Sequence, residues 1–394
     1  MIFNGYKGEK LSMLGFGAMR LPTLENGEID QNQVQTMVDD AIAAGVNYFD
    51  TAWPYHGGKS EISIAKALLK HPREKWNLAD KFPGHQISES YDPAGVFEKQ
   101  LEKCGVDYFD FYLLHNVNEQ SVNTYFDERW GIIDYFKEQK RLGRIRHLGF
   151  STHARVETMK SFLDRCGADM EFCQIQLNYL DWTLQGAKAK CELLAEYGIP
   201  VWVMEPLRGG KLAKLPDKLK SALEARRPGA SAAQWAFNFL QGIENVTVVL
   251  SGMSSREQML DNIRTFDSRR VLTEDEQKVL LDAAEGMKQS LPCTGCRYCC
   301  DGCPMGLNIP MLISYYNDLR FYASSNVGMA IDALPDDKRP SACIGCGACA
   351  QICPQNIDVP AAMADFADRL SKMPSWAQIC KERDEAQRRL ESKT

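Results

Sequence analysis

Residues 46–52 read VNYFDTA, a short run that is rich in β-branched and aromatic residues. An amphipathic stretch follows at 59–70, so the two together have the pattern of one strand and one helix. Runs of this kind are typical of parallel strands that are buried on both faces of a sheet. Seven further runs recur along the chain, at 14–19, 76–82, 109–115, 145–151, 172–178, 201–206 and 246–252.

Helix-like segments alternate with these runs. They lie at 30–44, 93–103, 129–142, 154–165, 185–197, 230–241 and 254–264 in addition to 59–70. Eight strand–helix units within about 265 residues match the number of units and the length that are typical of a (β/α)8 barrel. The predicted fold is therefore an α/β TIM barrel over residues 1–290. An open doubly wound sheet is the alternative, but no GxGxxG follows the first strand, which disfavours it.

Composition and charge exclude several classes of protein. The 394 residues are 44% hydrophobic and 25% charged, which is typical of a globular chain and not of a disordered or fibrous one. The net charge is −6 without a long Lys/Arg run, so we expect no nucleic-acid partner. No apolar stretch approaches the roughly 18 residues of a membrane helix. The N-terminus lacks a signal-peptide pattern, so we expect a cytoplasmic protein.

Nine of the fourteen cysteines lie between Cys293 and Cys353. In a reducing compartment such a cluster indicates metal ligation rather than disulfides. Two runs, at 293–304 and 343–354, share the spacing C-x2-C-x2-C-x3-C-P, which is the bacterial ferredoxin spacing for 4Fe–4S clusters. Zinc is the alternative, but paired C-x2-C zinc sites do not need the third and fourth cysteines of each run.

In this spacing, three closely spaced thiolates hold one cluster and the fourth cysteine ligates the other cluster. We therefore predict two 4Fe–4S clusters whose ligands are exchanged between the runs. The first takes Cys293, Cys296, Cys299 and Cys353, and the second takes Cys343, Cys346, Cys349 and Cys303. Cys300 lies outside the pattern and is expected to be a spare thiol.

These patterns divide the chain into three predicted parts. The barrel covers 1–290 and ends in a helix at 273–289, where Thr273 and Glu276 form a capping-box pair. A small, α-rich ferredoxin-like iron–sulfur domain covers 291–360, with a helical insertion between its two cysteine runs. A helical extension covers 361–394.

Polar residues stand at three successive strand ends of the predicted barrel. Asp50, Lys81 and His115 end the runs at 46–52, 76–82 and 109–115, and Tyr55 lies in the loop after the first of these. This end of a TIM barrel is the catalytic face. A Tyr hydroxyl can give a proton to a carbonyl oxygen as it gains negative charge, and a neighbouring Lys⁺ would lower the Tyr pKa for that task. Asp50 would hold Lys81, and His115 would orient the carbonyl or share the proton.

With these residues in place, the sequence resembles the aldo-keto reductase superfamily over about residues 10–266. The resemblance rests on GVNYFDTAxxY…E, on the strand ends at Lys81 and His115, on GFS at 149–151 and on SGMSSREQMLDN after the eighth run. It implies an oxidoreductase in which Asp50, Tyr55, Lys81 and His115 reduce a small-molecule carbonyl compound with hydride from NADPH.

The resemblance also implies cofactor contacts. Ser151 and Gln174 match residues that bond the nicotinamide carboxamide, and Met204 stands where many members stack a Tyr on the ring. The implied pyrophosphate loop contains Leu207, Arg208 and Gly209. Ser254 and Arg256 would replace the usual Lys at the 2′-phosphate, and Gln258 and Asn262 would contact the adenine. NADP(H) is therefore expected, with NAD(H) as the alternative. The implied substrate loops contain Met19, Arg20, Trp53, His56 and Trp182.

Three hypotheses connect the two modules. Nicotinamide moves two electrons as hydride, whereas 4Fe–4S clusters move one at a time. The favoured hypothesis is a carbonyl reductase whose redox-active clusters exchange electrons with the active site or with a redox protein partner. The alternatives are an ordinary reductase with a structural or docking iron–sulfur domain, and a non-enzymatic electron carrier on a barrel scaffold. The substrate and the oligomeric state stay open.

Overall fold

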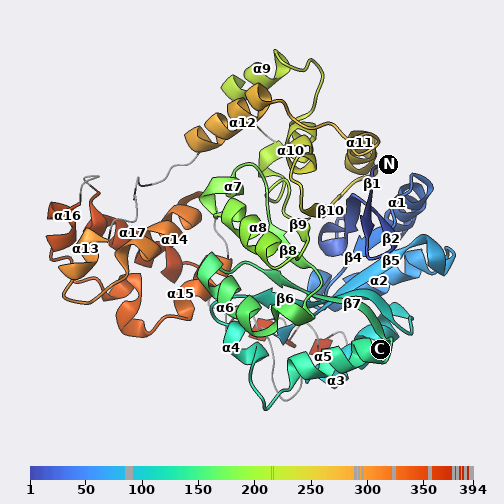
Figure 1. The fold of residues 1–394 in the computed structure, drawn as a ribbon, viewed down its shortest axis with the longest axis horizontal. Coiled ribbons are helices and arrows are strands. Elements are labelled where there is room, and N and C mark those ends of the chain that lie inside the picture. The colour runs from blue at the N-terminus through green and yellow to red at the C-terminus, as the bar shows by residue number, and fades with distance from the viewer. Residues whose placement is uncertain are drawn as a thin grey trace. The chain divides into compact units, whose positions relative to one another are not determined.

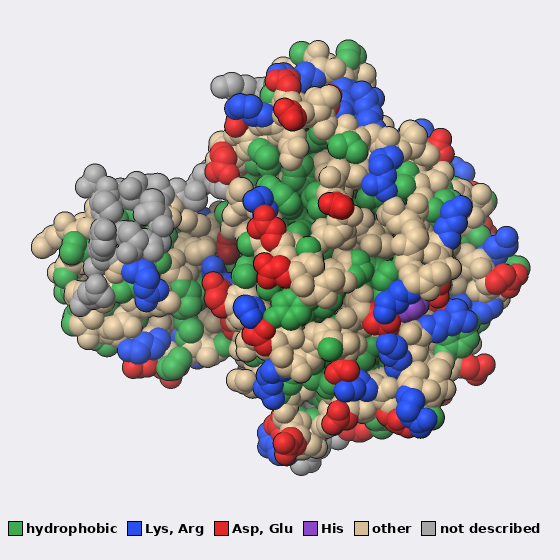
Figure 2. Space-filling model, viewed as in Figure 1, with side chains coloured by type: hydrophobic (Ala, Val, Ile, Leu, Met, Phe, Trp, Pro, Cys, Tyr) green, Lys and Arg blue, Asp and Glu red, His purple; other side chains and the backbone are tan. Residues whose placement is uncertain are grey.

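The chain forms two compact units, Met1–Ala283 and Ala284–Thr394. The computed structural model describes residues 1–84, 92–213, 215, 217–287, 291, 293, 297–321, 325–353, 357–374, 378, 381–382, 384–385 and 388–389. None of the helices in these described ranges is long and apolar enough to cross a membrane. Acidic and basic side chains are interspersed over the face shown in Figure 2, in keeping with the small net charge.

The first unit is a closed barrel of eight parallel strands enclosed by helices (Figure 1), as the sequence predicted. Hydrogen-bonded neighbours follow the order β10-β3-β4-β5-β6-β7-β8-β9, so chain order and spatial order agree around the ring. The strands are β3 Leu14–Gly17, β4 Tyr48–Asp50, β5 Asn77–Phe82, β6 Phe109–Val117, β7 Ile145–Thr152, β8 Cys173–Gln176, β9 Val201–Met204 and β10 Val246–Ser251.

A helix follows each barrel strand, close to the predicted positions. The helices are α1 Gln31–Ala43, α2 Ser60–Leu68, α3 Pro93–Cys104, α5 Ile132–Arg141, α6 Val156–Cys166, α8 Ala187–Glu196, α10 Ala232–Gln241 and α11 Arg256–Thr265, with the shorter α4 Val122–Tyr125, α7 Asp181–Leu184 and α9 Asp217–Glu224 between them. Asp30 caps α1 as expected, since its side chain accepts a hydrogen bond from the Gln33 backbone at 3.0 Å.

An N-terminal hairpin precedes the barrel and was not predicted. Its strands β1 Phe3–Tyr6 and β2 Glu9–Ser12 pair antiparallel across Lys7 and Gly8. Both turn residues have positive φ, 46° and 88°, as a two-residue type I′ turn requires. Tyr6 packs against the rings of Phe111 and Trp202, which belong to the buried interior of the barrel. The hairpin therefore covers the end of the barrel at which the strands begin.

Helix α12 Glu274–Met287 follows the last barrel helix and has the predicted cap. The Glu276 backbone donates to Thr273 Oγ1 at 3.3 Å, and the Thr273 backbone donates to Glu276 Oε2 at 2.9 Å. Arg227, before α10, forms an ion pair with Glu276. The start of α12 is thus held on the barrel by a charged contact.

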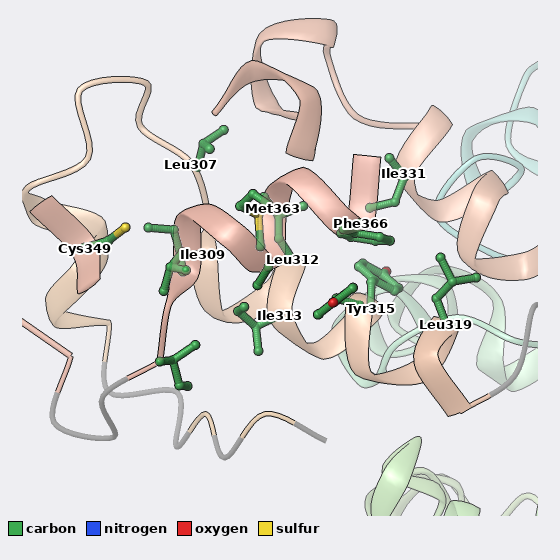
Figure 3. Packing of buried hydrophobic residues seen from close by; sticks show 14 of the residues in the cluster. Leu307, Ile309, Leu312, Ile313, Tyr315, Leu319, Ile331, Cys349, Met363 and Phe366 are labelled. Atoms are coloured by element: carbon green, nitrogen blue, oxygen red, sulfur yellow. The ribbon is translucent and has the colours of Figure 1, made fainter. Parts of the chain in front are cut away.

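The second unit is built of short helices around its own core. They are α13 Tyr298–Asp301, α14 Ile309–Phe321, α15 Ser325–Asp332, α16 Ala348–Gln351 and α17 Val359–Ser371. The predicted helical insertion between the cysteine runs corresponds to α14 and α15. Met363 and Phe366 of α17 pack with Leu312 and Ile313 of α14, and Cys349 lies at the edge of the same cluster (Figure 3).

Candidate functional site

The barrel strands bring the predicted site residues to one end of its interior. Side chains of alternate strand residues share a face. The interior is marked by a buried cluster that includes Tyr48, Ala79, Leu113, Phe172 and Trp202. Two residues further along the same strands stand Asp50, Lys81, His115, Gln174 and Met204. These five side chains therefore have the interior parity and lie toward the carboxyl ends of β4, β5, β6, β8 and β9.

Asp50 and Lys81 form a buried ion pair. Lys81 Nζ lies 2.5 Å from Asp50 Oδ1 and 2.7 Å from the Thr51 carbonyl oxygen, and the Lys81 side chain is fully buried. Burial disfavours the ammonium charge, but Asp50 and Tyr55 together outweigh it and raise the pKa of Lys81. Lys81 is consequently a fixed cation inside the barrel.

Tyr55 lies beside this cation. Lys81 Nζ is 5.0 Å from the centroid of the Tyr55 ring, and that ring meets the His115 ring edge-on with centroids 6.1 Å apart. The sequence predicted that Lys81 lowers the Tyr55 pKa. Lys81 does act in that direction, but burial is the larger effect and the pKa of Tyr55 is raised overall. Tyr55 therefore stays protonated at neutral pH and can donate its proton.

A β-bulge shapes β6 at His115. Leu114 pairs with Phe150 and Val117 with Thr152, so β6 has one residue more than β7 between these two pairs. The extra length is taken up next to Asn116, whose φ is +57°. The backbone carbonyl of His115 accepts a hydrogen bond from Tyr125 Oη at 2.5 Å, which fixes this turn of the strand.

Ser151 and Gln174 are neighbours across the paired strands β7 and β8. Ser151 Oγ accepts a hydrogen bond from the Asn116 backbone at 2.9 Å. Gln174 is buried, and within the described part of the chain its Oε1 has no hydrogen-bonding partner. A buried acceptor without a donor costs free energy, so it suits a ligand that brings N–H groups, as a nicotinamide carboxamide does. The residues present thus fit the predicted cofactor at this point.

Met204, the last residue of β9, is half-buried, and the loop that follows it contains Leu207, Arg208 and Gly209. Arg208 is buried, and its Nη1 lies 2.7 Å from Asp181 Oδ1 at the start of α7. Its guanidinium group is thus partly neutralised inside the fold. Gly209 is exposed with φ +65°, and a Cβ there would come within 3.1 Å of the Arg20 side chain. The loop therefore offers mainly its backbone and Gly209 to a ligand.

The segment after β10 places Ser254, Arg256 and Gln258 around the start of α11, whereas Asn262 lies further along that helix. Ser254, Arg256 and Gln258 are exposed, and the Ser254 backbone donates to Gln258 Oε1 at 2.9 Å. Arg256 Nε lies 2.6 Å from Asp40 Oδ2 of α1. Asn262 is buried and donates to Ser251 Oγ of β10 at 3.0 Å. In this arrangement Arg256 and Asn262 link α11 to its neighbours.

The predicted substrate loops differ in how open they are. Met19 is 52% exposed, whereas Trp53 is buried beneath Lys103, whose Nζ lies 3.8 Å from its ring centroid. His56 Nε2 accepts a hydrogen bond from the Leu21 backbone at 3.1 Å, and burial lowers the pKa of His56. Trp53 and His56 therefore shape the loop that carries Tyr55.

In the second unit, the cysteines of the later run line one cavity together with a cysteine of the earlier run. The cavity has an empty volume of about 350 Å³, part of it open to solvent. Its cysteines are Cys303, Cys343, Cys346 and Cys349, and its other walls are mostly apolar, among them Leu307, Ile309, Val359 and Met363. These are the four cysteines that the crossed ferredoxin spacing predicts for the second cluster. Among the described residues, however, no group of three or more His, Cys, Asp or Glu side chains is arranged to hold a metal ion.

The cysteines of the first predicted cluster are less fully described. Cys293, Cys303 and Cys353 pack, partly buried, against the core that contains Cys299 and Cys349. Burial raises the pKa of the Cys299 thiol to about 12, and neighbouring Cys300 and Cys293 add to the rise. Cys296, the remaining member of this ligand set in the first run, lies outside the described residues.

Comparisons with known proteins agree with the division of the chain into the units Met1–Ala283 and Ala284–Thr394. The profile of the aldo/keto reductase family matches residues 13–284, and the profile of a 4Fe-4S dicluster domain matches residues 292–357. The oxidoreductase YqkF from Bacillus subtilis is 27% identical over 300 residues, which are 68% of this chain and 92% of that protein.

Solved structures show the same fold. The holo form of the aldo-keto reductase AKR11C1 from Bacillus halodurans has a TM-score of 0.57 at 25% identity, covering 70% of this chain and 93% of that one. An aldo-keto reductase from Klebsiella pneumoniae in complex with NADPH has a TM-score of 0.55 at 19% identity, covering 71% and 94%. The chain therefore belongs to the aldo/keto reductase family of oxidoreductases and carries a 4Fe-4S dicluster domain after its (β/α)8 barrel.

Proposed function

We propose that the barrel reduces an aldehyde or ketone with NADP(H), with Tyr55 as the general acid. The observation that carries the proposal is the buried cation Lys81, which lies 2.5 Å from Asp50 Oδ1 and 5.0 Å from the Tyr55 ring centroid. When bound, the reduced nicotinamide supplies a hydride. The residues of the chain have to orient the carbonyl group and supply a proton to its oxygen.

Each of the four polar residues has a part in that task. Tyr55 donates its phenolic proton to the carbonyl oxygen as negative charge develops there. Lys81 stabilises the phenolate that remains, because its positive charge lies beside the ring. Asp50 keeps Lys81 in place, and His115, edge-on to Tyr55, orients the carbonyl oxygen.

The proposed cofactor-binding residues lie on β7, β8, β9 and the segments after β9 and β10. Ser151 and Gln174 would hold the carboxamide, Met204 would cover the ring, and Leu207, Arg208 and Gly209 would form the pyrophosphate loop. Ser254, Arg256 and Gln258, around the start of α11, and Asn262, further along that helix, would accept the phosphorylated adenosine. NADP(H) is proposed over NAD(H) because Arg256 is the cation at that helix start, although Asp40 partly offsets its charge.

Replacing Tyr55 by Phe tests the proposed acid. Tyr55→Phe removes the hydroxyl and keeps the ring against Lys81 and His115, so NADPH binding should persist while carbonyl reduction falls by roughly 10²- to 10⁴-fold. Single-turnover oxidation of NADPH by a panel of aldehydes, with NADPH affinity measured separately, gives both quantities. Reduction at the parental rate would mean that another group is the acid.

We further propose that the dicluster domain holds two redox-active 4Fe–4S clusters that exchange electrons with the barrel or with a redox protein partner. The cavity lined by Cys303, Cys343, Cys346 and Cys349 supports the second ligand set. When each cysteine run gives one ligand to the other cluster, the two clusters lie close enough to pass electrons to each other. A purely structural role does not require this closeness.

An anaerobic titration separates this proposal from a structural role. NADPH and then dithionite would be added while EPR spectra and the absorbance near 400 nm are recorded. Absorbance in this region comes roughly from charge transfer between thiolate and iron. A reduced-cluster signal with NADPH would support redox-active clusters that exchange electrons with the barrel. A signal with dithionite alone would favour an ordinary reductase with an appended ferredoxin domain, because dithionite can reduce a structural cluster as well. Clusters that neither reagent reduces would favour a structural or docking domain.

A further inference from the structure

A second buried amide oxygen without a described partner, besides that of Gln174, belongs to Asn116 next to the β6 bulge. Asn116 is 8% exposed, and among the residues that the structure describes its Oδ1 has no hydrogen-bonding partner. Asn commonly adopts a positive φ because its side chain bonds the local backbone. Here φ is +57°, yet the side-chain oxygen makes no such bond.

The backbone of Asn116 is held by other side chains instead. Its N–H donates to Ser151 Oγ at 2.9 Å, and its carbonyl oxygen accepts from Ser121 Oγ at 2.8 Å. Ser121 Oγ in turn accepts from the Asn118 backbone at 3.0 Å, which closes the loop on itself. The conformation of this loop is therefore fixed without the Asn116 amide.

The backbone of Asn116 adjoins the predicted carboxamide site. Ser151 stands between Asn116, to which it is hydrogen-bonded, and Gln174, its register partner on β8. Asn116 Oδ1 and Gln174 Oε1 are thus two buried acceptors for which the described residues provide no donor, and both belong to residues that adjoin Ser151. Ser151 Oγ already accepts one hydrogen bond, which leaves its own O–H to donate.

A nicotinamide carboxamide has the complementary set of groups. It brings two N–H donors and one carbonyl acceptor, which match two acceptors and one hydroxyl donor. We propose that Asn116 is a cofactor-binding residue whose Oδ1 accepts one N–H of the nicotinamide carboxamide, alongside Gln174 and Ser151. This inference rests on the proposed use of NADP(H) and adds a contact to it.

Two substitutions separate the amide from the backbone conformation. Asn116→Gly keeps the positive φ, which Gly adopts freely, and removes the acceptor. Asn116→Asp is the matched control, because Asp also tolerates this φ and keeps an acceptor at the same place. Thermal unfolding of both variants would establish that they fold.

The probes are NADP⁺ and its 3-acetylpyridine analogue, which keeps the carbonyl and has a methyl group in place of NH₂. Calorimetric titration measures both affinities without turnover. Asn116→Gly should weaken NADP⁺ by about three- to ten-fold, the value of one neutral hydrogen bond, and leave the analogue unchanged. Asn116→Asp should keep the parental preference for NADP⁺ over the analogue.

The other outcomes overturn the inference in distinguishable ways. If Asn116→Gly weakens both probes equally, or neither, Asn116 is a structural residue of the bulge and the proposed function stands. If the parent protein binds neither probe, the proposed use of NADP(H) fails together with the inference.

Discussion

The buried pair of Asp50 and Lys81 is stable only while both charges are present. Lys81 Nζ contacts Asp50 Oδ1 and the Thr51 carbonyl, and both side chains are nearly inaccessible to solvent. Lys81→Met should destabilise the fold by about 3–5 kcal/mol, because it leaves the Asp50 carboxylate buried without a counter-ion. The double variant Asp50→Asn with Lys81→Met should recover part of that loss. Urea unfolding of the two single variants and the double variant measures the coupling, and strictly additive losses would show that the two groups do not form a coupled pair.

Single residues also show which features of the candidate site can be predicted from the sequence. Asp50, Lys81 and His115 were predictable because strand parity and strand ends are local properties of the sequence. Asn116 was missed, because its burial depends on a bulge that only the pairing of β6 with β7 reveals. The ion pair of Arg208 with Asp181 was missed for a similar reason, since 27 residues separate the partners. The raised Tyr55 pKa reflects burial, which a motif does not report.

At the scale of elements, the hairpin β1–β2 is anchored to the barrel by a titratable group. The His147 ring packs against Tyr6 of the hairpin, and its Nε2 lies 3.3 Å from Glu9 Oε1 while its Nδ1 lies 3.5 Å from Glu171 Oε2. Burial opposes protonation of His147, but the two carboxylates outweigh it and raise the pKa above the usual value.

The raised pKa of His147 determines how the stability of the fold changes with pH. Protonated His147 is favoured in the folded state, so its contribution is full below the unfolded pKa of about 6.5 and is lost as pH rises through the folded value. Glu9→Gln should therefore destabilise the protein more at pH 6 than at pH 9. Thermal or urea unfolding of parent and variant at the two pH values checks this, and an equal loss at both would exclude a charged His147.

The hairpin itself escaped prediction, whereas the eight barrel strands did not. FNGY and EKLS have only four residues each, and polar residues or Gly interrupt their apolar residues, so they lack the apolar run by which the barrel strands were identified. Their place is decided by packing, in which Tyr6 fills the interior between Phe111 and Trp202. Such tertiary contacts do not appear in a single strand's pattern.

At the scale of the whole molecule, the two cysteine runs should depend on each other. Cys303 belongs to the first run but lines the cavity of Cys343, Cys346 and Cys349. Cys303→Ser should therefore disturb the cluster held mainly by the second run and lower the iron content below about eight atoms per chain. Cys300→Ser is the matched control, because Cys300 lies outside the spacing and its loss should leave iron content and EPR signals unchanged. A disturbance confined to the first-run cluster would contradict the exchanged ligands.

The molecule combines a barrel suited to hydride transfer with a domain suited to one-electron transfer, so the proposed function depends on the route by which electrons reach the carbonyl. Direct transfer at the Tyr55 site should carry the C4 hydrogen of NADPH onto the product carbon. The most direct test is anaerobic turnover of an aldehyde that the enzyme accepts with NADPH deuterated at C4, followed by mass spectrometry of the alcohol. With direct hydride transfer, one of the two C4 diastereomers should label the product fully. Alcohol without deuterium from either diastereomer would mean that the electrons reach the carbonyl by another route, and that the proposed barrel chemistry is wrong.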